Sequence, residues 1–217
     1  MAGPLLRRRG LIVASTGLAG SLALGPGWTS AAVSALTPAQ TEGPFYPVRL
    51  PDDRDADLVR VTGSDAAALG VVTHVQGRVL DRAGRPMGGI TVEIWQCDAN
   101  GRYRHPRDRR AREQDPGFQG YGRAITDAAG GYRFRTIRPV AYPGRTPHIH
   151  FKLGIARVEL LTTQMYVAGD PGNEHDPLLS AIPSLEDRRM LLVELAPGEQ
   201  IEAGALTGTF DIVIRAH

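Results

Sequence analysis

The chain has a single cysteine and almost no net charge. Cys97 is the only thiol among 217 residues, which excludes an intramolecular disulfide framework and any zinc or iron–sulfur site built from cysteines. The formal net charge of +2 is too small to indicate a nucleic-acid-binding protein. Internal repeats and glycine-rich phosphate-binding motifs are also missing. With 42% hydrophobic and 22% charged residues, the composition indicates a globular protein of one domain with a short appendage.

Residues 1–35 differ in kind from the rest of the chain. Three arginines at positions 7–9 precede an apolar stretch over Leu11–Leu24, and small residues at 33–35 offer a cleavage site. This order is typical of an export signal, and the adjacent arginines favour the twin-arginine type. The apolar stretch is interrupted by glycines and is too short to predict a membrane span. We expect an exported bacterial protein, periplasmic or secreted, with an uncleaved lipid-facing anchor as the alternative.

Residues 36–70 are polar and rich in proline. They include the run Thr41-Glu42-Gly43-Pro44-Phe45-Tyr46-Pro47, whose two prolines keep it out of helices and central strands. This segment is predicted to be an ordered amino-terminal arm, and a plain linker is the alternative interpretation.

Residues 71–217 are predicted to form the main domain. Short segments with alternating apolar residues are separated by turns rich in Gly and Pro, a pattern that favours an antiparallel β-sandwich. One short helix is predicted over Leu185–Leu195, with Ser184 as its N-cap. The fold is therefore expected to be mainly β. The predicted strands are Val71–Leu80, Ile90–Gln96, Tyr132–Ile137, His148–Leu153, Val158–Tyr166 and Thr209–Arg215.

The sequence His148-Ile149-His150 is a candidate metal-binding motif. Two imidazoles one residue apart on a strand project from the same face, close enough to bind one metal ion, while Ile149 faces the other side. Such pairs also occur on ordinary exposed strands. A proline-stiffened run, however, places Tyr142 and Arg145 just before the pair. Imidazoles and phenolates together suit a hard, oxidised metal ion such as ferric iron.

A zinc or copper hydrolase is the competing interpretation of the histidine pair. It would need a nearby acid as general base, but residues 136–153 contain no Asp or Glu, and the chain has no His-Glu-x-x-His motif. Arginines gather nearby in the sequence at positions 102, 104, 107, 109, 110 and 112. They predict either a solvated loop or a basic surface that attracts an anionic substrate toward the cleft.

An ordered succession of motifs resembles the intradiol ring-cleavage dioxygenases, a family that acts on protocatechuate, catechol and hydroxyquinol. The resemblance covers roughly residues 40–176, and an amino-terminal twin-arginine-like signal precedes it. The motifs are Val92-Glu93-Ile94-Trp95-Gln96-Cys97-Asp98-Ala99-Asn100-Gly101-Arg102-Tyr103-Arg104-His105, Asp115-Pro116-Gly117-Phe118, Gly122-Arg123-Ala124-Ile125-Thr126-Asp127, Tyr132-Arg133-Phe134-Arg135, His148-Ile149-His150-Phe151 and Thr163-Gln164-Met165-Tyr166.

The resemblance implies a mononuclear, non-haem Fe(3+) centre. Its implied ligands are Tyr103, Tyr142, His148 and His150. Arg145 and Gln164 match family residues that face bound substrate, and the arm at 41–46 matches a segment that lines the active site. Tyr142 would also take part in catalysis, because a displaced phenolate can accept a proton from substrate.

The implied activity is cleavage of a catechol-type ring by O2 between its two hydroxyl-bearing carbons, giving a cis,cis-muconate-type diacid. Only five residues separate Tyr142 from His148, fewer than in protocatechuate dioxygenases, so the ring substituents accepted stay open. The second hypothesis is an exported β-sandwich binding module without catalysis. Relatives often form oligomers, and a homo-oligomer is compatible with this interpretation. The remaining tyrosines at 121, 132 and 166 are expected in the core, and Cys97 as a small buried residue.

Overall fold

The computed structural model describes Met1 and residues 34–215. The export signal predicted over residues 1–35 falls almost entirely outside this part and stays a prediction. None of the helices in the described part is long and apolar enough to cross a membrane.

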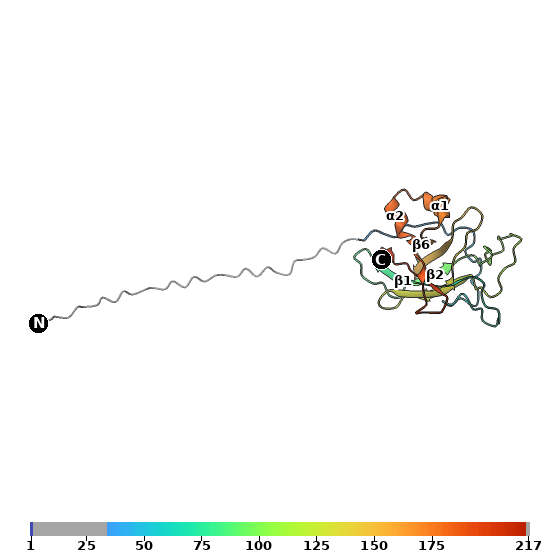
Figure 1. The fold of residues 1–217 in the computed structure, drawn as a ribbon, viewed down its shortest axis with the longest axis horizontal. Helices are drawn as coiled ribbons and strands as arrows, with labels where there is room; N and C mark the ends of the chain where they lie inside the picture. The colour runs from blue at the N-terminus through green and yellow to red at the C-terminus, as the bar shows by residue number, and fades with distance from the viewer. Residues whose placement is uncertain (2–33, 216–217) are drawn as a thin grey trace. The chain divides into compact units, whose positions relative to one another are not determined.

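Within residues 34–215, ten strands form two five-stranded sheets. In the first sheet β8, β9, β1 and β10 follow one another, and β4 pairs with β1; in the second sheet the order is β3-β2-β5-β6-β7. The strands are β1 (Val72–Asp81), β2 (Thr91–Trp95), β3 (Tyr121–Ile125), β4 (Gly131–Ile137), β5 (His148–Ile155), β6 (Val158–Val167), β7 (Leu192–Val193), β8 (Ala196–Pro197), β9 (Leu206–Thr209) and β10 (Ile212–Ile214). The helices are η1 (Pro171–Glu174), α1 (Pro177–Ser180) and α2 (Leu185–Met190), with α1 and α2 at the top of Figure 1.

The prediction of a mainly β sandwich is confirmed. Most pairings are antiparallel, including β2 with β5 and β5 with β6. The sheets are nevertheless mixed, because β1 pairs in parallel with β9 and β10, and β6 pairs in parallel with β7. These partners are joined by long connections rather than by hairpins, and such crossovers are what parallel pairing requires.

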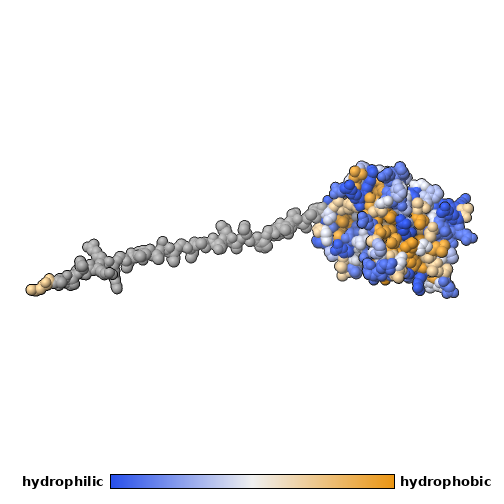
Figure 2. Space-filling model, viewed as in Figure 1, coloured by the Kyte–Doolittle hydropathy of each residue, from blue (hydrophilic) through white to orange (hydrophobic). Residues whose placement is uncertain are grey.

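The hydrophobic core lies between the two sheets. Val75 of β1 and Phe134 of β4 meet Ile94 of β2 and Phe151 of β5, and all four side chains are fully buried. Phe151 also packs edge-on against Phe210, with ring centroids 5.1 Å apart. On the face that Figure 2 shows, hydrophobic residues gather toward the middle and hydrophilic residues lie mostly around them.

The predicted helix and the last predicted strand are both shorter in the structure than expected. Helix α2 stops at Met190 rather than at Leu195, because the following Leu192–Val193 hydrogen-bonds along β6 instead. The strand predicted over Thr209–Arg215 contains only the last residue of β9 and the three residues of β10, and these two strands pair with successive halves of β1. The break falls at Phe210, whose carbonyl oxygen would lie 2.0 Å from a Cβ at Gly77. Strand β3 was not predicted.

Residues 34–70 run over both sheets without regular helices or strands. The backbone N–H of Thr37 donates to the Val213 carbonyl in the first sheet, and that of Gln40 donates to the Thr162 carbonyl in the second. Leu58 then inserts its fully buried side chain into the core. These contacts place Phe45 and Tyr46 against the outer face of the second sheet, where both pack beside Trp95 and Tyr103.

Candidate active site

The candidate site lies on the outer face of the second sheet. Alternation along β5 sends Ile149 and Phe151 into the core and presents His148 and His150 on the opposite face. Both imidazoles are nevertheless almost completely buried, with 1% and 2% exposure, because the loops before β5 and after β2 cover them.

The two imidazoles direct one nitrogen each toward a common point. The Nδ1 of His148 lies 2.7 Å from the Thr146 carbonyl oxygen. Because that oxygen can only accept, Nδ1 carries the proton and Nε2 keeps its lone pair. The Nε2 atoms of His148 and His150 are 3.2 Å apart. Burial and the positive charge of Arg145 lower the pKa of His148 to about 4, so this ring is neutral at pH 7.

Tyr103 and Tyr142 bring two phenols to the same point from separate loops. The Tyr142 hydroxyl is 3.5 Å from Nε2 of His148, and the Tyr103 ring lies edge-on to Tyr142 and His150. The buried Tyr103 hydroxyl has no hydrogen-bond partner among the described residues. Burial raises the pKa of both phenols, which keeps them protonated until a cation binds.

Arg145 is fixed beside this group by partners that lie far along the chain. Its Nε donates to Asp176 over 2.8 Å, and Nη2 donates to Gln164 Oε1 over 2.5 Å. Nη1 lies 3.4 Å from His148 Nε2. Gln164 is itself held by donation from its Nε2 to the Thr41 carbonyl. All six sequence-predicted site residues are therefore brought together, although their roles stay predictions.

Several contributors to the site were missed from the sequence. Asp176 accepts a hydrogen bond from Arg145 and is also the N-cap of α1. Asp176 followed by Pro177 is a sequence pattern that indicates the start of a helix, but it does not indicate that Arg145 is the partner of this carboxylate. Trp95 stacks on His150, with centroids 4.7 Å apart and planes 8° apart. Tyr166, expected only as a core residue, accepts a hydrogen bond from Arg145 and donates one to Gln40.

Part of the arginine-rich segment lies directly over the site. Most of its arginines are exposed, as expected for a solvated loop, but Arg110 is half-buried. Its Cζ is 4.9 Å from the Tyr142 ring centroid and 5.7 Å from that of Phe45. Phe45 in turn stacks on Tyr103, with centroids 4.5 Å apart.

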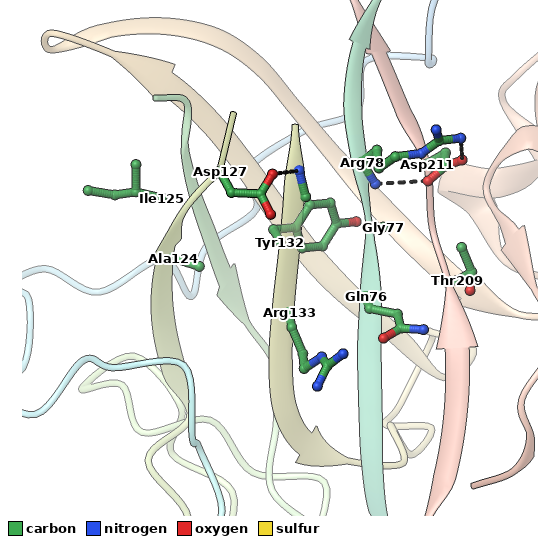
Figure 3. Close-up of a pocket in the computed structure, with 11 residues that line it drawn as sticks. Gln76, Gly77, Arg78, Ala124, Ile125, Asp127, Tyr132, Arg133, Thr209 and Asp211 are labelled. Atoms are coloured by element: carbon green, nitrogen blue, oxygen red, sulfur yellow. Dashed lines mark hydrogen bonds and ion pairs between the residues drawn. The ribbon is translucent and has the colours of Figure 1, made fainter. Parts of the chain in front are cut away.

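A groove elsewhere on the surface contains none of the predicted site residues. It encloses about 700 Å³ and is lined by β1, β4 and the segment from Thr209 to Asp211 (Figure 3). Arg78 and Asp211 are paired across it. The candidate site residues are thus separate from this groove.

The donor set fits a ferric ion. No three His, Cys, Asp or Glu side chains gather as a metal site in the part of the chain that the structure describes. The candidate site offers instead two neutral imidazoles and two phenols, one with an unpartnered buried hydroxyl. Phenolate oxygens favour a hard, highly charged ion, and two of them would neutralise much of the charge of Fe(3+).

The comparisons with known proteins assign this β-sandwich to the intradiol dioxygenases. A family model described as a dioxygenase matches residues 41–216, and the chain belongs to this family. The chain is 43% identical to the protocatechuate 3,4-dioxygenase beta chain of Burkholderia cepacia, over 75% of its own length and 72% of that chain. It is 32% identical to a catechol 1,2-dioxygenase of Candida albicans, over 62% of its own length and about half (48%) of the relative's.

A solved structure has the same fold. The dioxygenase domain of a dioxygenase carbohydrate-binding protein fusion from Streptomyces sp. SirexAA-E superimposes with a TM-score of 0.63. The match covers 84% of this chain and 100% of that domain, at 33% sequence identity. The likeness therefore extends over the whole catalytic domain of that fusion protein.

Proposed function

We propose that this protein is a mononuclear, non-haem ferric dioxygenase. It cleaves a catechol-type ring between the two hydroxyl-bearing carbons, and both atoms of O2 enter a cis,cis-muconate-type diacid. One observation carries the proposal: the facing Nε2 atoms of His148 and His150, 3.2 Å apart, share their site with the unpartnered hydroxyl of Tyr103. The names of the similar proteins support the same reaction class.

Tyr103, Tyr142, His148 and His150 would hold the iron. When bound there, ferric iron supplies Lewis acidity that lowers the pKa of the catechol hydroxyls and draws electron density from the ring toward reaction with O2. The protein fixes the ligands beforehand. Thr146 sets the tautomer of His148, and Asp108 accepts the backbone N–H of Tyr103 over 2.7 Å.

The surrounding residues bind the substrate and handle its protons. A catechol that binds through both oxygens must lose two protons, and Tyr142 would accept one of them, because burial raises the pKa of this phenol. The guanidinium of Arg145 faces the same point and stabilises negative charge on the substrate oxygens. Phe45 and Trp95 cover the ring faces of Tyr103 and His150 and exclude water there.

The test compares two buried tyrosines in iron-loaded protein. Wild type should be burgundy-red from tyrosinate-to-iron charge transfer and should consume O2 with a catechol. Tyr103→Phe should lose the colour and the activity. Tyr132→Phe is the matched control, since its hydroxyl donates to the Phe210 carbonyl away from the site; it should keep both and lose about 1 kcal/mol of stability.

Two results would contradict the proposal. Colourless iron-loaded wild type would show that the phenols are not ligands. Catechol binding without O2 uptake by iron-loaded protein would favour the alternative of a binding module with the same fold.

A further inference from the structure

Lys152 lies on the same face of β5 as the histidine pair but has no place in the proposed metal centre. Because side chains alternate along a strand, Lys152 and His150 both point to the outer face of the second sheet. Strand pairing places Glu93 beside Lys152 and Trp95 beside His150. The surface that carries the imidazole therefore continues directly into a pair of charged side chains.

The ammonium group of Lys152 contacts the amino-terminal arm at two points. Its Nζ donates to Glu42 over 2.5 Å and lies 4.4 Å from the ring centroid of Tyr46. The Tyr46 hydroxyl in turn donates to Glu93 over 2.8 Å. Two adjacent strands thus hold the arm through one ion pair, one cation–π contact and one hydrogen bond.

The stretch of the arm between these contacts, residues 41–46, covers two of the proposed metal ligands. Phe45 stacks on Tyr103, with ring centroids 4.5 Å apart. The backbone of Gly43 lies beside His150, since a Cβ there would be 3.6 Å from the imidazole Cε1. The contacts near the two ends of this stretch therefore decide whether both ligands stay covered.

The ion pair that holds the arm is open to solvent and has a counterpart within the sheet. The side chains of Lys152 and Glu42 are 22% and 40% exposed, so water and salt weaken their attraction. Lys152 also pairs with Glu159 of β6 over 3.3 Å. The lysine thus has one acidic partner in the arm and one in the sheet, and each can be removed separately.

We propose that Lys152 is a positioning residue that holds residues 41–46 closed over the site. Through Glu42 and the Tyr46 ring it fixes a stretch whose backbone and side chains lie on the proposed ligands. When these contacts are weakened, the stretch opens more often, and substrate binds more weakly because it binds the closed form. The effect on substrate rests on the proposed ring-cleaving function, whereas the opening of the arm is independent of it.

The test compares the two acidic partners of Lys152 in iron-loaded, full-length protein. Tryptic cleavage after the exposed Arg49 reports how often the arm opens, since cleavage follows the population of the open form. Steady-state kcat and KM are measured with catechol. Glu42→Gln should raise the cleavage rate and KM by about 2- to 5-fold, the usual effect of losing a partly exposed ion pair, with kcat unchanged. Glu159→Gln is the matched control, because it removes a charge from the same lysine outside the arm, and it should leave both quantities at wild-type values.

Variants of the lysine itself separate its charge from its packing. Lys152→Met loses the ion pair and the cation–π contact, so cleavage after Arg49 should become about 5- to 25-fold faster. Lys152→Arg should restore most of the wild-type behaviour, because a guanidinium makes both kinds of contact. Raising the ionic strength from about 0.1 M to about 1 M should speed cleavage in wild type but not in Lys152→Met. Iron content and colour should stay those of wild type, since no ligand is changed.

Several results would overturn the proposal. Equal effects of Glu42→Gln and Glu159→Gln would assign the role of Lys152 to the sheet, and a wild-type cleavage rate in Lys152→Met would show that the lysine does not hold the arm. A lower kcat at unchanged KM, together with loss of colour, would mean that the substitutions act on the ligands instead. If iron-loaded wild type consumes no O2 with catechol, the proposed function fails separately, and the cleavage rates still decide about Lys152.

Discussion

Replacing Asp176 with Asn should destabilise the protein and misdirect Arg145. The Asp176 side chain is fully buried, and Oδ2 accepts from Arg145 Nε over 2.8 Å and from Thr146 N over 3.0 Å. Oδ1 accepts the backbone N–H groups of Leu178 and Leu179 at the start of α1. Both oxygens therefore face only donors. An asparagine amide group must turn its NH2 toward one of these pairs, whichever way it is placed.

The magnitude follows from the burial of the ion pair. Removing one partner of a buried pair costs about 3–5 kcal/mol, and because Arg145 retains 12% exposure we expect the lower end, about 3 kcal/mol. For a domain of this size that corresponds to a fall in Tm of roughly 6–12 °C. Although burial acts in the opposite direction, hydrogen bonds from Leu179, Arg145 and Thr146 lower the pKa of Asp176. The carboxylate is therefore charged at pH 7.

Urea denaturation and catechol kinetics would measure the two effects. Asp211→Asn is the matched control, because Asp211 pairs with Arg78 over 3.3 Å at 40% and 58% exposure; it should cost less than about 1 kcal/mol. Asp176→Asn should also lower kcat/KM, since Arg145 loses the contact that aims it. If the two variants unfold at the same urea concentration, the burial argument is wrong.

Two further predictions concern the first sheet. Gly77→Ala should cost about 2–3 kcal/mol, because the new Cβ would lie 2.0 Å from the Phe210 carbonyl oxygen; an unchanged unfolding midpoint would contradict this. Hydrogen bonding from Arg135 lowers the pKa of Glu202 from 4.5 to about 2, so its stabilisation is present at neutral pH and is lost as pH falls from about 4.5 to about 2. Glu202→Gln should therefore flatten the pH dependence of the unfolding free energy in this window.

The sequence predicted most of the second sheet because its pattern is local. Alternation over His148–Leu153 decides which side chains face the core, and that requirement does not depend on the partner strands. Ser184 likewise marks the start of α2, because its Oγ accepts a hydrogen bond from the backbone N–H of Asp187. The resemblance to a known family was needed to select Tyr103 from among the tyrosines as a candidate ligand, since a phenol alone has no local sequence pattern that indicates metal binding.

Strand β3 was not predicted because the reason for its sequence is not local. Its sequence, Tyr121–Ile125, contains Gly122 and lacks a clear alternation. Glycine is required there because a Cβ would lie 2.7 Å from the Asp55 carbonyl oxygen and 2.5 Å from the Leu58 side chain. The close approach of residues 55–58, which makes the glycine necessary, exists only in the folded protein.

The amino-acid sequence by itself determined the β-rich class and the strand that presents the histidine pair, and the resemblance to a known family added the two tyrosines to the candidate ligands. Tertiary structure alone decided how these groups are held, because the partners come from distant segments. Asp176 meets Arg145 across 31 positions, and Trp95 meets His150 through strand pairing. The placement of Arg110 over Tyr142 depends on two loops meeting above one sheet, and no periodicity within either loop encodes that contact.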